Sequence, residues 1–266
     1  MLKTIVLFAA ASYLAIAAVV WFIQDTLVFF PQSASTRPIV PPAWTLQDVR
    51  LQAKDGTPLV GYLMRPPADK PPLLIYFGGN AEEATGAASS PERFGNRALL
   101  AFNYRGFGTS GDKPSEAAIM ADAVEVFDWA ARRPDIDAGR IALHGRSLGT
   151  AVALQVASQR PVKALVLTSP FESVRDLAKR IYPWLPVTIL LRHPFDAGVL
   201  APSTKAPALV LFGNSDATIP PDHSERLAAR LGGAVERVSI ANRGHNDLES
   251  DAQYFPAILR FLDKHL

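Results

Sequence analysis

Short apolar runs alternate with amphipathic segments along most of the chain after residue 44. Five of these runs are apolar at nearly every position: LLIYF from Leu73, LLAFN from Leu99, IALH from Ile141, ALVLT from Ala164 and ALVLF from Ala208. Such runs are typical of strands buried on both faces of a sheet. The intervening stretches carry apolar residues at helical spacing, as in Ser115–Arg132. This alternation predicts a mostly parallel central sheet flanked by helices.

The elements at the two ends of this pattern complete one predicted domain, residues 45–266. Near its start, the β-rich runs TLQDVRLQA and PLVGYLM flank Lys54-Asp55-Gly56, and an Asp-Gly turn between such runs predicts an antiparallel hairpin. Near its end, a helix over Asp222–Leu231, a strand over Val235–Ile240 and a helix from about Asp251 to Leu266 are expected.

The first 24 residues have a different character and are predicted to be a membrane anchor. The stretch Ile5–Ile23 contains no charged residue, and about 20 apolar residues suffice for a helix to cross the hydrocarbon of a bilayer. Lys3 precedes the stretch and Asp25 follows it. The positive-inside tendency therefore predicts a single-pass protein with its N-terminus in the cytoplasm and the domain on the extracytoplasmic side.

A cleaved signal peptide is the alternative interpretation of this stretch, because Ala15-Ile16-Ala17 has the small-residue pattern of a cleavage site. Cleavage there would leave AVVWFIQDTLVFF as the new N-terminus. That end is still strongly apolar, which favours a retained anchor. Residues 25–44 include the proline-rich Pro31–Pro42 and are predicted to be an extended spacer.

The composition excludes several kinds of site but does not indicate a binding partner. The chain has 27 basic and 25 acidic residues and a net charge of +2, with no long block of one sign, so nucleic acid is not an expected partner. It has no cysteine, which excludes disulfides, zinc–thiolate sites and thiol nucleophiles. No metal or cofactor is implied, and the oligomeric state cannot be inferred.

Polar and glycine residues follow the predicted strands at the positions where a parallel sheet binds ligands, which are the carboxyl ends of its strands. In chain order they are Gly78-Gly79-Asn80, Arg105-Gly106, Ser147, Ser169, Asp216 and His245.

Ser147 is the candidate nucleophile. It is the serine of a G-x-S-x-G pattern, Gly145–Gly149, with a predicted strand before it and helix-compatible residues after it. This spacing makes a sharp strand-to-helix turn that exposes the serine hydroxyl near a helix N-terminus. The pattern alone is weak, and a glycine-rich turn with a solvated serine is the plainer interpretation.

A serine nucleophile needs a base and an acid, and the best candidates are His245 and Asp216. His245 follows the last predicted strand in ANRGHND, and Asp216 follows the strand before it in LVLFGNSDATIPP. The order Ser, Asp, His is the one such a fold uses. Rival residues have other expected roles: a core position for His144, surface or helix positions for His193, His223 and His265, and a helix N-cap for Asp222. Asp247 is too close in sequence to His245 to reach its ring easily.

An oxyanion in such a site needs two backbone N–H donors. The expected donors are Leu148, directly after the nucleophile, and Asn80, in the loop after the strand LLIYF. For Asn80, a glycine turn that only reverses the chain is the alternative.

Together these motifs resemble the α/β-hydrolase superfamily, and within it the membrane-anchored abhydrolase-domain subgroup related to serine-aminopeptidase-like hydrolases. The resemblance covers nearly the whole chain, through FIQDTLVFFP, IYFGGNAEE, NYRGFGTSGDKPSE, HGRSLGTAVAL, PALVLFGNSDATIPP and RGHND. It implies Ser147 as nucleophile, Asp216 as acid, His245 as base and Gly78–Asn80 as oxyanion loop. Gly78 departs from the subgroup, which usually has histidine there. Arg105–Gly108 matches a family turn with an expected structural role.

The resemblance implies a serine hydrolase that cleaves carboxylic esters or thioesters, with acyl or lipid substrates among the possibilities. A peptidase, amidase or acyltransferase would use the same triad, and a catalytically idle, membrane-tethered scaffold is the non-enzyme alternative. The fold inserts a lid at about residues 171–202, where this chain is rich in large apolar residues. These residues either line an acyl pocket or, as Ile181, Trp184 and Leu190 would allow, only pack a helix onto the sheet.

Overall fold

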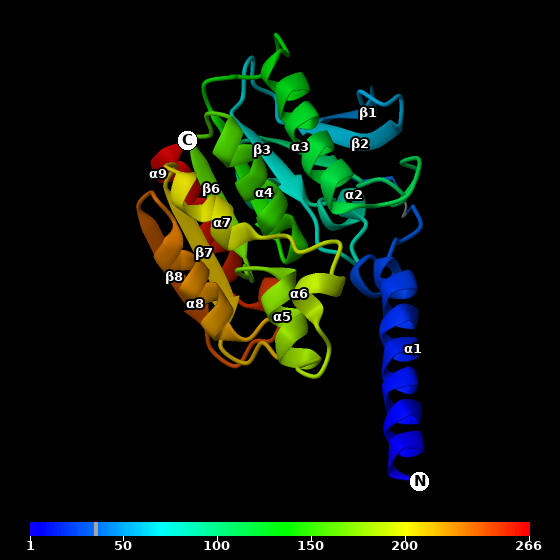
Figure 1. Cartoon of the computed structure of the whole chain (residues 1–266). Helices are drawn as coiled ribbons and strands as arrows, with labels where there is room; N and C mark the ends of the chain where they lie inside the picture. Colours follow the sequence, from blue (N-terminus) through cyan, green and yellow to red (C-terminus); the bar gives the residue numbers. More distant parts are fainter. Residues whose placement is uncertain (35–36) are drawn as a thin grey trace.

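The computed structural model describes residues 1–34 and 37–266. An eight-stranded sheet with the order β1-β2-β4-β3-β5-β6-β7-β8 forms its centre (Figure 1). The strands are β1 Thr45–Gln52, β2 Pro58–Arg65, β3 Leu73–Phe77, β4 Ala98–Phe102, β5 Ile141–Arg146, β6 Ala164–Thr168, β7 Ala208–Gly213 and β8 Val235–Ile240.

The pairing confirms the predicted hairpin and the mostly parallel sheet. β1 and β2 are antiparallel around the Asp55-Gly56 turn, and β2 is also antiparallel to β4. β3 to β8 are all mutually parallel. β3 to β7 are buried at nearly every position, because helices cover both faces of the sheet.

Two helical layers enclose the sheet. One face packs against α3 (Glu116–Ala131), α4 (Leu148–Gln159) and α8 (Pro221–Arg230). The other packs against α9 (Tyr254–His265), α2 (Ala84–Ala87) and the 3₁₀ turn η1 (Pro91–Phe94). Alternate residues of β3 enter the two cores, with Ile75 in the first and Tyr76 in the second. The hydrolase fold expected from the sequence is therefore confirmed.

Two details of the helix ends differ from the sequence prediction. Asp222 is not an N-cap: α8 begins at Pro221, with Pro220 as its cap, because proline is favoured at the first helical position. Asp222 instead lies in the first turn and pairs with Arg226 at 2.5 Å. The closing helix α9 begins at Tyr254, and the 3₁₀ turn η3 (Leu248–Ser250) precedes it.

The N-terminal helix α1 (Leu2–Val28) projects from the domain, with the N-terminus at its free end (Figure 1). It is long and apolar enough to cross a membrane, with a mean hydropathy of 2.4, and a signal sequence would have the same character. The helix continues four residues beyond the predicted end of the anchor at residue 24, and Val28 and Phe29 pack into the core of the domain. The first residues of the predicted spacer therefore belong to the fold. Residues 35–36 of that spacer lie outside the described residues.

The segment between β6 and β7 contains the helices α5 (Val174–Ile181), α6 (Val187–Leu190) and α7 (Ala197–Leu200) and the 3₁₀ turn η2 (Ala201–Ser203). Ser173 caps α5 by accepting a hydrogen bond from the backbone N–H of Asp176 at 3.0 Å. α5 and α6 lie between the sheet and α1 (Figure 1). From here on we use the name lid for residues 171–191, the part of the predicted lid (about 171–202) that contains these two helices.

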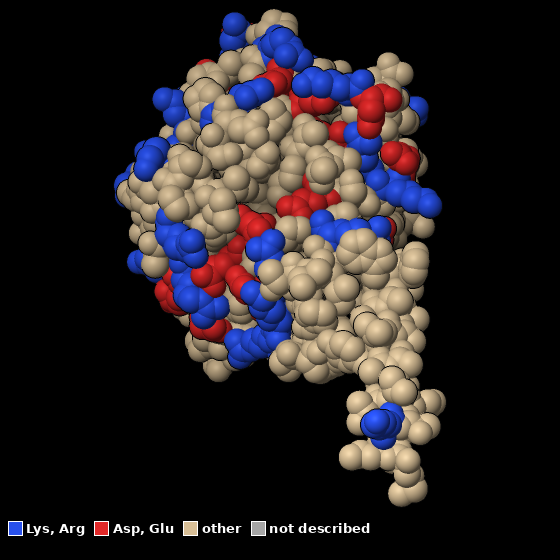
Figure 2. Space-filling view, viewed as in Figure 1, with Lys and Arg blue, Asp and Glu red and all other residues tan. Residues whose placement is uncertain are grey.

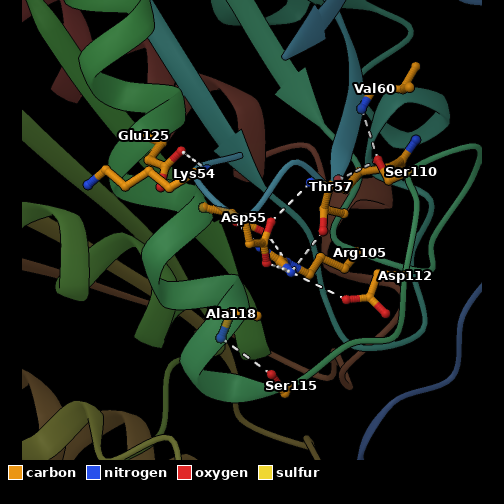
Figure 3. A network of polar contacts seen from close by, with 12 residues as sticks. Lys54, Asp55, Thr57, Val60, Arg105, Ser110, Asp112, Ser115, Ala118 and Glu125 are labelled. Atoms are coloured by element: carbon orange, nitrogen blue, oxygen red, sulfur yellow. Dashed lines mark hydrogen bonds and ion pairs between the residues drawn. The ribbon is translucent and has the colours of Figure 1, made fainter. Parts of the chain in front are cut away.

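A buried arginine, Arg105, ties the turn of the β1–β2 hairpin to α3, and Figure 3 shows its contact with Asp55 at that turn. Arg105 donates to both carboxylate oxygens of Asp122, at 2.7 and 2.8 Å, and to Asp55 at 2.5 Å. Its side chain is 6% exposed and that of Asp122 is 8% exposed. The hydrogen bond from Arg105 is the main cause that lowers the pKa of Asp55 well below its usual range. Arg105 is therefore buried and held by ion pairs, as expected if the turn Arg105–Gly108 has a structural role.

Candidate active site

The turn that carries Ser147 is sterically constrained. Ser147 has φ 52° and ψ −118°, a conformation rarely adopted by a residue with a side chain. A Cβ atom on Gly145 would lie 2.3 Å from the carbonyl oxygen of Gly149, and one on Gly149 would lie 2.0 Å from that of Phe77. Both glycines of the G-x-S-x-G pattern are therefore required by the close approach of β3, β5 and α4.

Ser147, His245 and Asp216 lie within hydrogen-bonding distance of one another. His245 Nε2 is 3.0 Å from Ser147 Oγ, and His245 Nδ1 is 2.8 Å from Asp216 Oδ2. These separations meet the geometric requirement for a nucleophile, a base and a group that orients the base. The fold therefore brings together three residues that follow β5, β7 and β8.

Asp216 is held as an ionised acceptor behind the histidine. Its Oδ1 atom accepts hydrogen bonds from the backbone N–H groups of Thr218 at 2.9 Å and Ile219 at 2.8 Å. Burial opposes ionisation of this carboxyl, but the hydrogen bond from His245 and the two backbone donors outweigh it and lower the pKa of Asp216. A carboxylate in this position favours the His245 tautomer that carries its proton on Nδ1.

The rival histidines and carboxylates have other partners. Asp247 accepts from the backbone N–H of Gly244 at 2.7 Å and so fixes the loop that carries His245. His144 is buried at 3.0 Å from Thr168 Oγ1, and burial lowers the pKa of its imidazole to about 3. His193 was expected at the surface or in a helix, and it is instead buried outside any helix, beside Phe29 and with Asp25 at 3.0 Å from its Nε2 atom. That expectation was wrong because His193 contacts α1, a helix 168 residues earlier in the chain.

The backbone N–H groups of Asn80 and Leu148 remain without an acceptor in the described part of the chain. The neighbouring N–H of Gly79 is already used, because it donates to Glu82 Oε2 at 2.8 Å. The position of Asn80 is fixed by its side chain, which donates to the carbonyl of Val28 at 2.8 Å, and by its carbonyl, which accepts from Phe30 N–H at 2.9 Å. Asn80, Leu148 and Ser147 line one cavity.

A half-buried ion pair joins the loop of Asn80 to the loop of His245. Arg146 Nη1 lies 3.1 Å from Glu82 Oε2, while Arg146 Nη2 donates to the carbonyl of His245 at 3.2 Å. Burial disfavours the charge on Arg146, but Glu82 and the nearby Tyr76, Tyr254 and Glu249 together outweigh this effect and raise the pKa of Arg146. Sequence reasoning missed this pair, because the variable position of a G-x-S-x-G pattern gives no sign of a partner 64 residues away.

The cavity above Ser147 has a volume of about 420 Å³ and is lined mostly by apolar side chains. Lid residues form part of its wall, including Leu177, Ile181 and Leu190. Trp184 does not line it, and Ile181 and Trp184 are too exposed to pack a helix onto the sheet. Within residues 1–34 and 37–266, no group of three His, Asp or Glu side chains could hold a metal ion.

Comparison with known proteins agrees with this fold. A family described as alpha/beta hydrolase fold matches residues 93–191. The chain is 36% identical to protein Rv2307c of Mycobacterium tuberculosis, over 91% of this chain and 88% of that one. It is 28% identical to the alpha/beta hydrolase domain-containing protein WAV2 of Arabidopsis thaliana, with the same coverage.

Solved structures of esterases share the fold. The acetyl xylan esterase from Paenibacillus sp. R4 has a TM-score of 0.72 at 23% identity and covers 88% of this chain and 87% of its own. The Pyrococcus furiosus esterase Pf2001 has a TM-score of 0.72 at 20% identity and covers 90% of this chain and 99% of its own. The family match over residues 93–191, the relative described as an alpha/beta hydrolase domain-containing protein and the shared fold agree: the chain belongs to the alpha/beta hydrolase superfamily.

Proposed function

We propose that the protein is a serine hydrolase that cleaves carboxylic esters or thioesters through an acyl-enzyme intermediate. The observation that carries the proposal is the pair of hydrogen-bonding distances at the serine turn: 3.0 Å from Ser147 Oγ to His245 Nε2 and 2.8 Å from His245 Nδ1 to Asp216 Oδ2. The esterases of similar fold are consistent with this chemistry, but a shared fold does not define a substrate.

In the first half of the reaction, Ser147 Oγ attacks the carbonyl carbon of the substrate while His245 Nε2 accepts its proton. The negative charge that develops on the carbonyl oxygen is stabilised by the backbone N–H groups of Asn80 and Leu148. Collapse of this intermediate breaks the bond to the leaving alcohol or thiol. His245 returns the proton to that leaving group, and the acyl group remains on Ser147.

In the second half, water replaces the leaving group. His245 accepts a proton from the water as its oxygen attacks the acyl carbon, and then returns the proton to Ser147 Oγ as the carboxylic acid leaves. Asp216 stays ionised throughout and stabilises the imidazolium. The Arg146–Glu82 pair connects the donor loop to the histidine loop and so holds the two in register.

A fluorophosphonate probe tests the proposed nucleophile. The probe should form a covalent adduct with the folded protein, and the adduct should lie on the tryptic peptide that begins at Ser147, after cleavage at Arg146. Mass spectrometry of the digest locates the modified residue. Heat-denatured protein is the control and should not react. An adduct on another serine, or equal reaction of the denatured protein, would reject the assignment.

We also propose that α1 is a retained anchor and that the domain lies on the extracytoplasmic side. The support is Lys3 before the apolar stretch and Asp25 after it, together with the core positions of Val28 and Phe29, which join the helix to the domain. Protease added to spheroplasts should therefore digest the domain, which immunoblotting detects. A domain that is digested only after the membrane is lysed would place it on the cytoplasmic side.

A further inference from the structure

Helix α1 forms part of the wall of the cavity above Ser147. Val20, Gln24, Leu27 and Val28 line the cavity from α1, opposite the lid residues Leu177, Ile181 and Leu190. The helix is therefore positioned to contact whatever occupies the cavity, in addition to tethering the domain.

Polar contacts hold the lid along α1. Gln24 is buried, and its side chain donates to the carbonyl of Leu190 at 3.1 Å and accepts from the N–H of Arg192 at 2.7 Å. Farther toward the N-terminus, Tyr13 Oη donates to the carbonyl of Trp184 at 3.0 Å. Tyr13 and Gln24 are eleven residues apart, so the lid follows the helix for about 16 Å.

The lid exposes large apolar side chains beside this helix. Ile181 is 62% exposed, Trp184 53% and Ile189 80%. Figure 2 shows that the lid and α1 form a continuous surface with few charged atoms, and that charged residues gather along its border. Because Tyr13 lies near the middle of α1, a bilayer crossed by this helix also surrounds the part of the lid beside Tyr13.

The mouth of the cavity lies on the same surface. Two residues from its wall are also exposed, Leu27 on α1 at 46% and Ile181 at the end of α5 at 62%, so the cavity reaches the surface between the helix and the lid. An apolar opening at this position faces acyl chains when α1 is in a bilayer.

We propose that residues 181–190 of the lid, which carry no charge, are immersed in the bilayer beside α1, and that the cavity receives the long acyl chain of an ester that resides in the membrane and enters between α1 and the lid. This substrate class rests on the proposed serine hydrolase function. A long chain would fill the apolar cavity while its carbonyl carbon reaches Ser147, at the polar end of the same space.

The experiment uses the full chain reconstituted in dioleoyl phosphatidylcholine vesicles and two esters with the same leaving group. 4-Methylumbelliferyl oleate dissolves in the bilayer, and 4-methylumbelliferyl acetate is offered from water. Ile189 is exposed and does not line the cavity, so Ile189→Glu should lower oleate hydrolysis about tenfold or more, because a carboxylate is costly to insert among acyl chains. Acetate hydrolysis should stay within about twofold.

A matched control variant places the same charge on an exposed apolar residue outside the lid. Val199 is 72% exposed on α7, and Val199→Glu should leave both rates unchanged. If Ile189→Glu lowers the oleate rate no more than Val199→Glu does, the inference is overturned. The proposed function still stands in that case if the protein hydrolyses the acetate ester.

Fluorescence tests the immersion of the lid without catalysis. Brominated phosphatidylcholine should quench tryptophan emission, and Trp184→Phe should remove a measurable part of the quenching, because bromine on an acyl chain quenches only at close range. Equal quenching of both proteins would overturn the inference. Failure to hydrolyse either ester, with quenching at Trp184 intact, would instead reject the proposed function.

Discussion

Ser147→Ala is expected to lower kcat for a water-soluble ester by about 10⁴-fold or more, since removal of a serine nucleophile disables the nucleophile and its base together. The hydroxyl is the only part of the side chain that is removed, and its hydrogen bond in this site is the one to His245, at 3.0 Å. Steady-state hydrolysis of p-nitrophenyl acetate measures the loss. The thermal unfolding midpoint should stay close to that of the wild type, because the backbone of the turn is fixed by Gly145, Gly149 and the Ser147 N–H to Thr168 bond.

Ser169→Ala is the matched control. Ser169 is also a buried serine with positive φ directly after a parallel strand, but its hydroxyl has no hydrogen-bond partner in the described part of the chain. The replacement removes the same atom without touching His245, so activity should change less than about threefold. Equal losses in the two variants would mean that the site depends on packing at the strand ends and not on the Ser147 hydroxyl.

The parts of this molecule that follow from local pattern could be predicted from the sequence. Strands buried on both faces must be apolar throughout, and β3, β5, β6 and β7 were predicted within two residues of their ends. The candidate site could be predicted from the same pattern, because the carboxyl ends of parallel strands meet at one edge of the sheet. Only a few polar residues directly follow the predicted strands, so the candidates were few. Whether Ser147, Asp216 and His245 act as a catalytic triad stays a prediction.

The parts that depend on contacts between distant segments could not be predicted. α1 is apolar around its whole circumference, so its sequence does not indicate that the face with Gln24 packs against the lid. Asp25 suggested the end of the apolar helix, but the helix continues to Val28, and Asp25 pairs with Arg192 at 2.8 Å. α1 and the segment after β6 form this pair and line one cavity although they are far apart in the sequence, with 167 positions between Asp25 and Arg192.

Arg105→Ala is expected to destabilise the domain by about 3–5 kcal/mol, because it leaves the buried carboxylate of Asp122 without its ion-pair partner. The variant also loses the link from α3 to the hairpin turn through Asp55 (Figure 3). Urea denaturation in detergent, followed by the circular dichroism of the domain, measures the change. Lys264→Ala removes an exposed partner of Glu236 and should cost less than about 1 kcal/mol.

The double variant Arg105→Met, Asp122→Leu separates the two causes of that loss. If the unpaired carboxylate dominates, replacing both charges by apolar side chains of similar size should restore most of the lost stability. If the double variant stays as unstable as Arg105→Ala, the bond from Arg105 to Asp55 contributes more to stability than the pair with Asp122, and Asp55→Ala alone should reproduce the destabilisation. A loss for Arg105→Ala no greater than that for Lys264→Ala would show that Asp122 finds another partner or water, contrary to its 8% exposure.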